Sequence, residues 1–534
     1  MLPHTKKHVS IRMNKSSLLL LLVARAATAV IAALTLNAQA AAPPAFDNGK
    51  GAFATGKYRN LFVEIGKSDA EIKARVDRAY KQLFEGDLKS QRLFIPAGTN
   101  DNGPLAYIPD IQHTDVRSEG MSYGMMIAVQ MNKKEVFDAL WNWSHTYMYH
   151  ADTNHPNYGY FSWQMNYDGT AISEGAAPDG EEYYAMSLLF AANRWGNSKG
   201  IYDYKTMAHK ILTDMVHRQS GGSGRMNNAG RKIPSPRIPA DPYEMGTVYI
   251  QMSDYVPGTN APQGGRRGGM RGFGGMDGGG TNFAAGRFGG MGGGFTNQSG
   301  TNFVGGRRGG MGGFGGDGGA RGGAPRMNNM VSLEHKMIRF VAGANYTDPS
   351  YHLPAFYELW ARWGSAEDSQ LWYEAAQVSR DHFVNAANPE TGLCPNYSNW
   401  DGTPSGGGST FMEDAWRCSM NWSADWNWFQ KDPRQQVLSD HIQKFFESKG
   451  EKYNDHWVLD GSQSRRNRHS PGLVATLGAA SLAASDAERS KKFAEALWNL
   501  DVPSSLVFRY YDGLLYMMCM LHASGQFQVI MPQQ

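Results

Sequence analysis

The sequence predicts an all-α fold. Twelve stretches carry apolar residues at the three- and four-residue spacing of a helix, and few stretches alternate apolar and polar residues as strands do. With 534 residues, of which 41% are hydrophobic and 12% aromatic, the chain can fill one large helical core. Twelve helices in one domain are compatible with six helical hairpins in a double-layered α-barrel, but helix count alone does not require the ring to close.

The first predicted helix begins at a capping box. Ser68 and Glu71 can each accept the other's backbone N–H, and Ile72, Val76 and Leu83 follow at helical spacing. Eleven further stretches have helical composition and periodicity: 118–131, 134–148, 180–193, 203–217, 352–363, 367–387, 411–428, 432–448, 471–484, 486–499 and 511–524.

The N-terminus has the pattern of an export signal. A basic lead precedes the apolar stretch Leu18–Leu36, and Ala38-Gln39-Ala40 fits the small-residue cleavage rule. Arg25 interrupts the apolar stretch, which argues against a stable membrane span. We therefore expect residues 1–40 to be a signal peptide and the mature chain, beginning near Ala41, to be secreted or periplasmic.

One segment departs sharply in composition from the rest. Between Pro257 and Pro325 lie 30 of the chain's 63 glycines, and we expect the low-complexity stretch 256–326 to be disordered. It resembles an Arg-Gly-Gly nucleic-acid tail, but the export signal and a net charge of only +3 favour no nucleic-acid partner. A flexible insertion or a weakly adhesive loop fits better.

The three cysteines have no metal-ligand spacing. Cys394, Cys418 and Cys519 are an odd number in an exported chain, so at least one stays unpaired. A Cys394–Cys418 bridge is one interpretation, and three buried thiols is the one we favour. No phosphate loop or dinucleotide fingerprint is present, so we expect no cofactor and no metal.

A carboxyl group stands where an almost uncharged helix begins. Glu119 precedes a run of Met, Ile, Ala and Val that must be buried on most sides. Burial raises the pKa of a carboxyl group, which suits a general acid. The alternative is a first-turn carboxylate that caps free backbone N–H groups.

Four strings, in order along the chain, resemble glycoside hydrolase family 8, in particular its reducing-end xylose-releasing exo-oligoxylanases. They are Asp115–Gln130, Pro178–Tyr183, Thr347–Trp360 and Gly472–Thr476, and the likeness covers roughly 48–224 and 329–530. The resemblance implies an (α/α)6 barrel and one catalytic domain over 41–534, interrupted by an insertion at about 225–328. It also implies inverting hydrolysis of β-1,4-xylooligosaccharides, with xylose released from the reducing end.

The resemblance assigns roles to four residues. Glu119 becomes the general acid, Asp414 the general base, Asp179 the stabiliser of the transition state, and Tyr351 the group that positions the attacking water. In inverting enzymes the acid and base stand roughly 6.5–9.5 Å apart to admit that water. Each residue also has a structural interpretation: Asp179 as a helix N-cap, Asp414 as an i,i+3 ion-pair partner of Arg417, and Tyr351 as loop packing.

Neighbouring carboxylates compete for these roles. Glu413 is the rival for the base, and Asp348 is interpreted as the cap of the helix over 352–363.

Three further residues are expected to bind substrate. By resemblance, His469 closes the groove past the leaving sugar and gives exo action, and Arg417 and Tyr123 complete the set. Two other functions remain open: an endo-β-1,4-xylanase or other β-1,4-glycanase of the same family, and a non-catalytic glycan-binding surface protein. Xylooligosaccharide is the expected partner, and the sequence leaves the oligomeric state undetermined.

Overall fold

The computed structural model describes residues 44–218 and 329–533, and the residues from Asp47 onward form one unit. The predicted signal peptide 1–40 and Gly-rich segment 256–326 lie outside the described residues, so both stay predictions.

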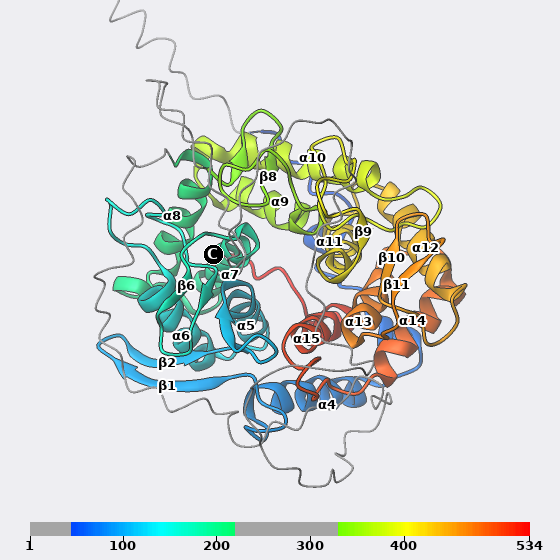
Figure 1. Cartoon of the computed structure of the whole chain (residues 1–534), viewed down its shortest axis with the longest axis horizontal. Coiled ribbons are helices and arrows are strands. Elements are labelled where there is room, and N and C mark those ends of the chain that lie inside the picture. Colours follow the sequence, from blue (N-terminus) through cyan, green and yellow to red (C-terminus); the bar gives the residue numbers. More distant parts are fainter. Residues whose placement is uncertain (1–43, 219–328, 534) are drawn as a thin grey trace, which may run out of the picture. The chain divides into compact units, whose positions relative to one another are not determined.

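All twelve predicted helices are present, and they alternate along the chain between an outer and an inner layer (Figure 1). The outer helices are α4 (Asp69–Tyr80), α6 (Lys134–Trp143), α8 (Tyr204–His217), α10 (Ser369–Ala386), α12 (Arg434–Glu447) and α14 (Ala487–Asn499). The inner helices are α5 (Ser118–Gln130), α7 (Pro178–Trp195), α9 (Pro354–Trp363), α11 (Glu413–Phe429), α13 (Pro471–Ala480) and α15 (Tyr511–Ala523). Two short helices, α2 (Ala52–Thr55) and α3 (Leu61–Glu64), precede them.

How much of each helix is buried follows from its amino-acid composition. All ten residues of α13 are buried, whereas α4 buries only four of its twelve, at the helical spacing of Ile72, Val76, Ala79 and Tyr80. A helix that is apolar all round must lie inside, and a helix with one apolar stripe covers it from outside.

The inner ring closes. Helices α11, α13, α15, α5 and α7 pack in that order, and α9 packs against α11. Between α7 and α9, Tyr183 packs edge-on against Phe356, and the Tyr357 hydroxyl donates to Glu182 at 2.5 Å. The first outer helix, α4, packs against the last inner one, α15. The predicted (α/α)6 barrel is therefore confirmed.

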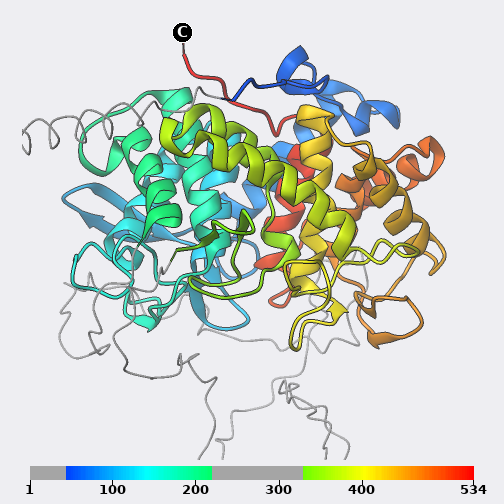
Figure 2. The ribbon, with the colours of Figure 1, turned by 90° about the horizontal axis from the view of Figure 1, so that it is seen from above.

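The strands are short and lie in the segments that connect the helices along the chain (Figure 2). They form four small antiparallel sheets: β1 (Ile95–Asn100) with β2 (Gly103–Tyr107); β3 (Pro109–Asp110), β4 (Asp115–Arg117), β5 (Gln164–Met165) and β6 (Ala171–Ser173); β7 (Val331–Ser332) with β8 (Met337–Ile338); and β9 (Thr410–Phe411), β10 (His456–Val458) and β11 (Ser464–Arg466). Because β4 and β9 run directly into α5 and α11, these sheets fix where two inner helices begin.

Several helix boundaries differ from prediction, and three of the differences involve a neighbouring strand, turn or π-helical segment. Helix α11 starts at Glu413, not at 411, because Phe411 pairs with Trp457 in a sheet. Helix α9 starts at Pro354, because Pro349–Tyr351 forms a separate 3₁₀ turn. Helix α6 ends at Trp143, and a π-helical turn continues it to Met148.

The cysteines are three buried free thiols, which confirms the favoured interpretation over a Cys394–Cys418 bridge. Among the residues that the structure describes, no helix has the length and apolarity needed to cross a membrane.

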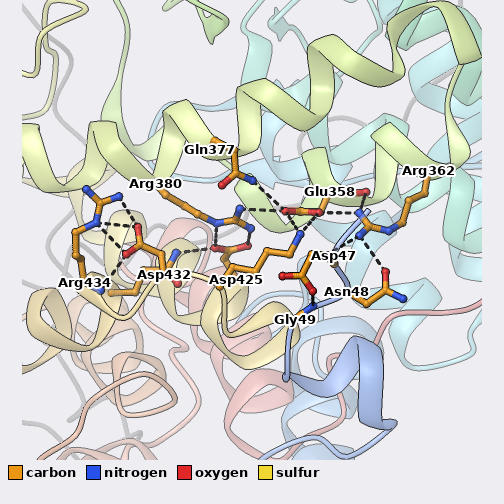
Figure 3. Close-up of polar contacts among 12 residues, drawn as sticks. Asp47, Asn48, Gly49, Glu358, Arg362, Gln377, Arg380, Asp425, Asp432 and Arg434 are labelled. Carbon is orange, nitrogen blue, oxygen red and sulfur yellow. Dashed lines mark hydrogen bonds and ion pairs between the residues drawn. The ribbon is translucent and has the colours of Figure 1, made fainter. Parts of the chain in front are cut away.

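A buried ionic network joins α9, α10 and α11 (Figure 3). Glu358 is fully buried and accepts from Arg362 at 2.7 Å, from Arg380 at 3.0 Å and from Lys431 at 2.8 Å. Arg380 also binds both carboxylate oxygens of Asp425, each at 2.7 Å. Burial alone would raise the pKa of Glu358, but the surrounding cations outweigh it and hold that pKa below its usual value.

The same network holds the start of the unit. Arg362 donates from Nη2 to the carbonyl of Asp47 at 3.3 Å and to the side chain of Asn48 at 3.1 Å (Figure 3). One carboxylate on α9 therefore connects three cations and, through one of them, the first residues of the unit.

We expect Glu358→Gln to lower the free energy of unfolding by about 3–5 kcal/mol, because it leaves buried cations without their shared anion. Urea denaturation at about pH 7 measures this. Glu447→Gln is the matched control: Glu447 pairs with Arg489 and Lys492 at the surface, and its loss should cost at most about 1 kcal/mol. Because the pKa of Glu358 is lowered, the difference between Glu358→Gln and wild type should shrink as pH falls below about 4. Equal effects of the two variants would contradict a central role for this network.

Candidate active site

Three of the predicted carboxylates occupy the same position in three inner helices. Glu119, Asp179 and Asp414 are each the second residue, in α5, α7 and α11. A helix N-terminus carries partial positive charge, which favours acidic side chains there. Their contacts with one arginine bring the three helix starts together at one end of the ring.

One guanidinium group binds all three carboxylates. Arg417 is 2% exposed, and its Nη1 donates to Glu119 at 3.1 Å and to Asp179 at 3.0 Å. Its Nη2 lies 3.3 Å from Asp414, the predicted i,i+3 pair. The structure thus brings together the three carboxylates that the family resemblance singles out, and Arg417 is the group that joins them.

Two glycines allow the helix starts to approach this closely. A Cβ atom on Gly180 would lie 2.6 Å from the Ser118 hydroxyl, so α5 and α7 could not pack as they do. A Cβ atom on Gly120 would lie 2.4 Å from the ring of Tyr510, whose hydroxyl donates to Glu119 at 3.2 Å. The glycines that follow Glu119 and Asp179 are therefore required by the close packing of these helix starts.

The environment of Glu119 favours its protonated form. Burial is the largest influence and raises its pKa, Arg417 opposes this, and the charges of Asp179 and Asp414 raise it further, to about 8. Burial also raises the pKa of Asp179 against the same arginine. Glu119 can therefore carry a proton at neutral pH while it lies beside a cation.

The carboxylates differ in exposure. The side chain of Asp414 is 30% exposed, that of Glu119 15%, and that of Asp179 8%. The more exposed Asp414 can meet a water molecule, whereas the more buried Glu119 suits proton donation. The rival Glu413 instead pairs with Arg466 and Arg468.

Two capping interpretations need correction. The N-cap of α7 is Ala177, and Asp179 lies inside the helix, where its Oδ1 accepts from the N–H of Gly180. Asp348 caps the 3₁₀ turn Pro349–Tyr351 through the N–H of Ser350, whereas α9 begins after Leu353. Both shifts arise because α9 is preceded by a separate turn and α7 begins at a proline.

The turn that carries Tyr351 lies against the same arginine. The Arg417 guanidinium carbon is 5.4 Å from the centre of the Tyr351 ring, and its Nη2 donates to the Ser350 hydroxyl at 2.9 Å. Burial raises the pKa of Tyr351, so its phenol stays protonated and can donate a hydrogen bond.

The residues expected to bind substrate are placed less simply. Tyr123 accepts from Arg417 Nη1 at 2.6 Å, so these two side chains bind each other and the carboxylates. His469 packs edge-on against Tyr453 and bonds the Tyr453 carbonyl through Nδ1 at 2.8 Å. The structure therefore brings Arg417 and Tyr123 into the carboxylate cluster and places His469 in the loop before α13.

Sequence reasoning missed Tyr510 and Tyr511. Tyr510 donates to Glu119, and the hydroxyl of Tyr511 donates to the carbonyl of Glu413 beside Asp414. Both stand where α15 begins, the same place in an inner helix that holds each carboxylate. That shared position is the signal that could have found them.

Among the residues that the structure describes, no three His, Cys, Asp or Glu side chains form a group that could hold a metal ion.

We expect Arg417→Met to destabilise the protein by about 3–5 kcal/mol at pH 8, because three carboxylates lose their common cation. Without it the raised pKa values of Glu119 and Asp179 rise further, so these two groups are more fully protonated at about pH 5 and the loss should be smaller there. Denaturant titration at both pH values measures this, with the surface variant Arg434→Met as control. A loss that grows towards pH 5 would contradict this electrostatic role.

The model of the family described as glycosyl hydrolases family 8 matches residues 108–231 and 330–525. The chain is 34% identical over 487 residues to the reducing-end xylose-releasing exo-oligoxylanase Rex8A of Paenibacillus barcinonensis, covering 90% of this chain and 99% of that protein. It is 33% identical to the reducing end xylose-releasing exo-oligoxylanase of Halalkalibacterium halodurans, covering 91% of this chain and 97% of that protein.

A solved structure is also similar. The xylobiose complex of a family 8 protein from Teredinibacter turnerae is 37% identical, with a TM-score of 0.69, and the match covers 90% of this chain and 100% of that one. With the family model matching more than half of its residues, this chain belongs to glycoside hydrolase family 8.

Proposed function

We propose that this chain hydrolyses β-1,4-xylooligosaccharides with inversion and releases xylose from the reducing end. The observation that carries the chemistry is the convergence of Glu119, Asp179 and Asp414 on Arg417. The names of the two curated relatives support the substrate and the end that is cut.

Each carboxylate has one task in this mechanism. Glu119, protonated below a pKa of about 8, donates its proton to the departing glycosidic oxygen. Asp179 steadies the positive charge that develops on the sugar ring. Asp414 takes a proton from the water that attacks the opposite face, and Tyr351 holds that water.

An endo-acting xylanase of the same family is the second candidate. A solved relative from Teredinibacter turnerae, 37% identical, is described as a xylanase. The Nδ1 atom of His469 bonds the Tyr453 carbonyl at 2.8 Å, so this ring nitrogen is engaged by the protein itself. Exo action requires the other ring nitrogen of His469, Nε2, to meet the reducing-end xylose, as proposed for this residue.

We also propose that the protein is exported and that residues 1–40 are removed. A basic lead, an apolar stretch and a small-residue cleavage site support this. N-terminal sequencing of protein expressed from the full chain should begin near Ala41, and a product that retains Leu18–Leu36 would contradict it.

We expect Glu119→Gln to lower kcat on xylooligosaccharides by about 10²–10⁴-fold, because the proton donor is lost. Wild-type kcat should fall as pH rises through about 8, where Glu119 loses its proton. Steady-state kinetics across pH 5–9 measure both effects, with Glu447→Gln as the matched control at the surface. Near-normal turnover by Glu119→Gln would contradict the acid assignment.

The products of xylotriose labelled at its reducing end separate the two candidate functions. Reducing-end exo action gives labelled xylose and unlabelled xylobiose, because one sugar lies beyond the cleaved bond. An enzyme that leaves xylotriose intact but rapidly lowers the viscosity of long xylan is an endo-xylanase, and this result would contradict the proposed end-specificity.

A further inference from the structure

Three sets of hydrogen bonds hold the turn that carries Tyr351. Asp348 accepts from the N–H of Ser350 at 2.7 Å and so closes the turn. The hydroxyl of Tyr357 lies 3.1 Å from the carbonyl of Tyr351 and shares its one proton between this carbonyl and Glu182 on α7. The third set is made by the hydroxyl and the main-chain carbonyl of Ser350, which both bind α11.

Helix α11 binds Ser350 with two side chains one turn apart. Arg417 donates to its hydroxyl at 2.9 Å, and Asn421 donates from its side-chain amide to its main-chain carbonyl at 2.7 Å. Asn421 is 4% exposed, so this carbonyl is satisfied by an amide within the protein interior.

One face of α11 therefore carries both Asp414 and the groups that hold the turn. Residues three and four apart share a helix face, so Asp414, Arg417 and Asn421 lie in one row. A helix is stiff over two turns, and this row sets the distance between Asp414 and the backbone that bears Tyr351.

We propose that Asn421 is a positioning residue for the attacking water. It fixes Tyr351 relative to Asp414 through the Ser350 carbonyl, so that the phenol and the carboxylate meet the same water molecule. This inference rests on the proposed function and adds to it a residue that touches neither substrate nor water. Its loss should impair the attack of water and leave proton donation by Glu119 intact.

The test uses Asn421→Leu, which keeps the size of the side chain and removes its amide. We expect kcat on xylotriose to fall by about 100-fold with KM nearly unchanged, the scale at which a shift of about 1 Å in a reacting group acts. Asn427→Leu is the matched control, because Asn427 is a buried asparagine on another face of the same helix. Thermal unfolding checks that both variants fold, and Asn421→Asp serves in place of Asn421→Leu if the latter does not.

A second substrate shows which half of the reaction is damaged. The substrate β-xylobiosyl fluoride releases its fluoride ion without a proton from Glu119, but a water molecule must still attack the sugar carbon. Asn421→Leu should therefore keep its loss on the fluoride, whereas Tyr510→Phe, which removes a hydroxyl bound to Glu119, should be defective on xylotriose and recover on the fluoride.

Three outcomes would overturn the inference. Normal kcat for Asn421→Leu, recovery of this variant on the fluoride, or an equal loss in Asn427→Leu would each show that Asn421 does not position the water. Wild-type protein that cleaves neither substrate would overturn the proposed function and this inference together, and so distinguishes the two failures.

Discussion

The site depends on one buried arginine. Arg417 binds carboxylates from three inner helices and the turn before a fourth, so its position fixes the relative placement of every proposed reacting group. Two acids, Glu119 and Asp179, share one of its nitrogens, and Asp414 lies at the other. Because a planar guanidinium has a rigid arrangement of donors, the geometry that it imposes is fixed as well.

Helix α11 is held by ionic contacts at both of its ends. Arg417 lies near its start, in the cluster of carboxylates, and Asp425 near its end binds Arg380 of the buried network around Glu358. The contact between Asp425 and Arg380 holds the end of α11 in the barrel. The contacts of Arg417 hold its start among the carboxylates of the site. Stability and function are therefore connected through one helix rather than through the site alone.

The sequence predicts the helices well and their junctions less well. Twelve helices follow from sequence, because the outer helices bury one apolar stripe at helical spacing and the inner helices are apolar on most sides. The separate turn Pro349–Tyr351 is not predicted, because a run of three residues has no period to detect. Family resemblance brought Glu119, Asp179 and Asp414 together correctly, but Arg417 was expected to bind substrate. Its role as their shared partner depends on helix packing, which spacing within one helix does not contain.

Glu119 keeps its proton because burial and two neighbouring carboxylates outweigh an arginine 3.1 Å away. The most direct test is the infrared difference spectrum between wild type and Glu119→Gln, followed from pH 5 to 9. A band of a protonated carboxyl group should persist at pH 7 and disappear with a midpoint near pH 8. A carboxyl that is already ionised at pH 5 would contradict Glu119 as the proton donor and the electrostatic balance around Arg417.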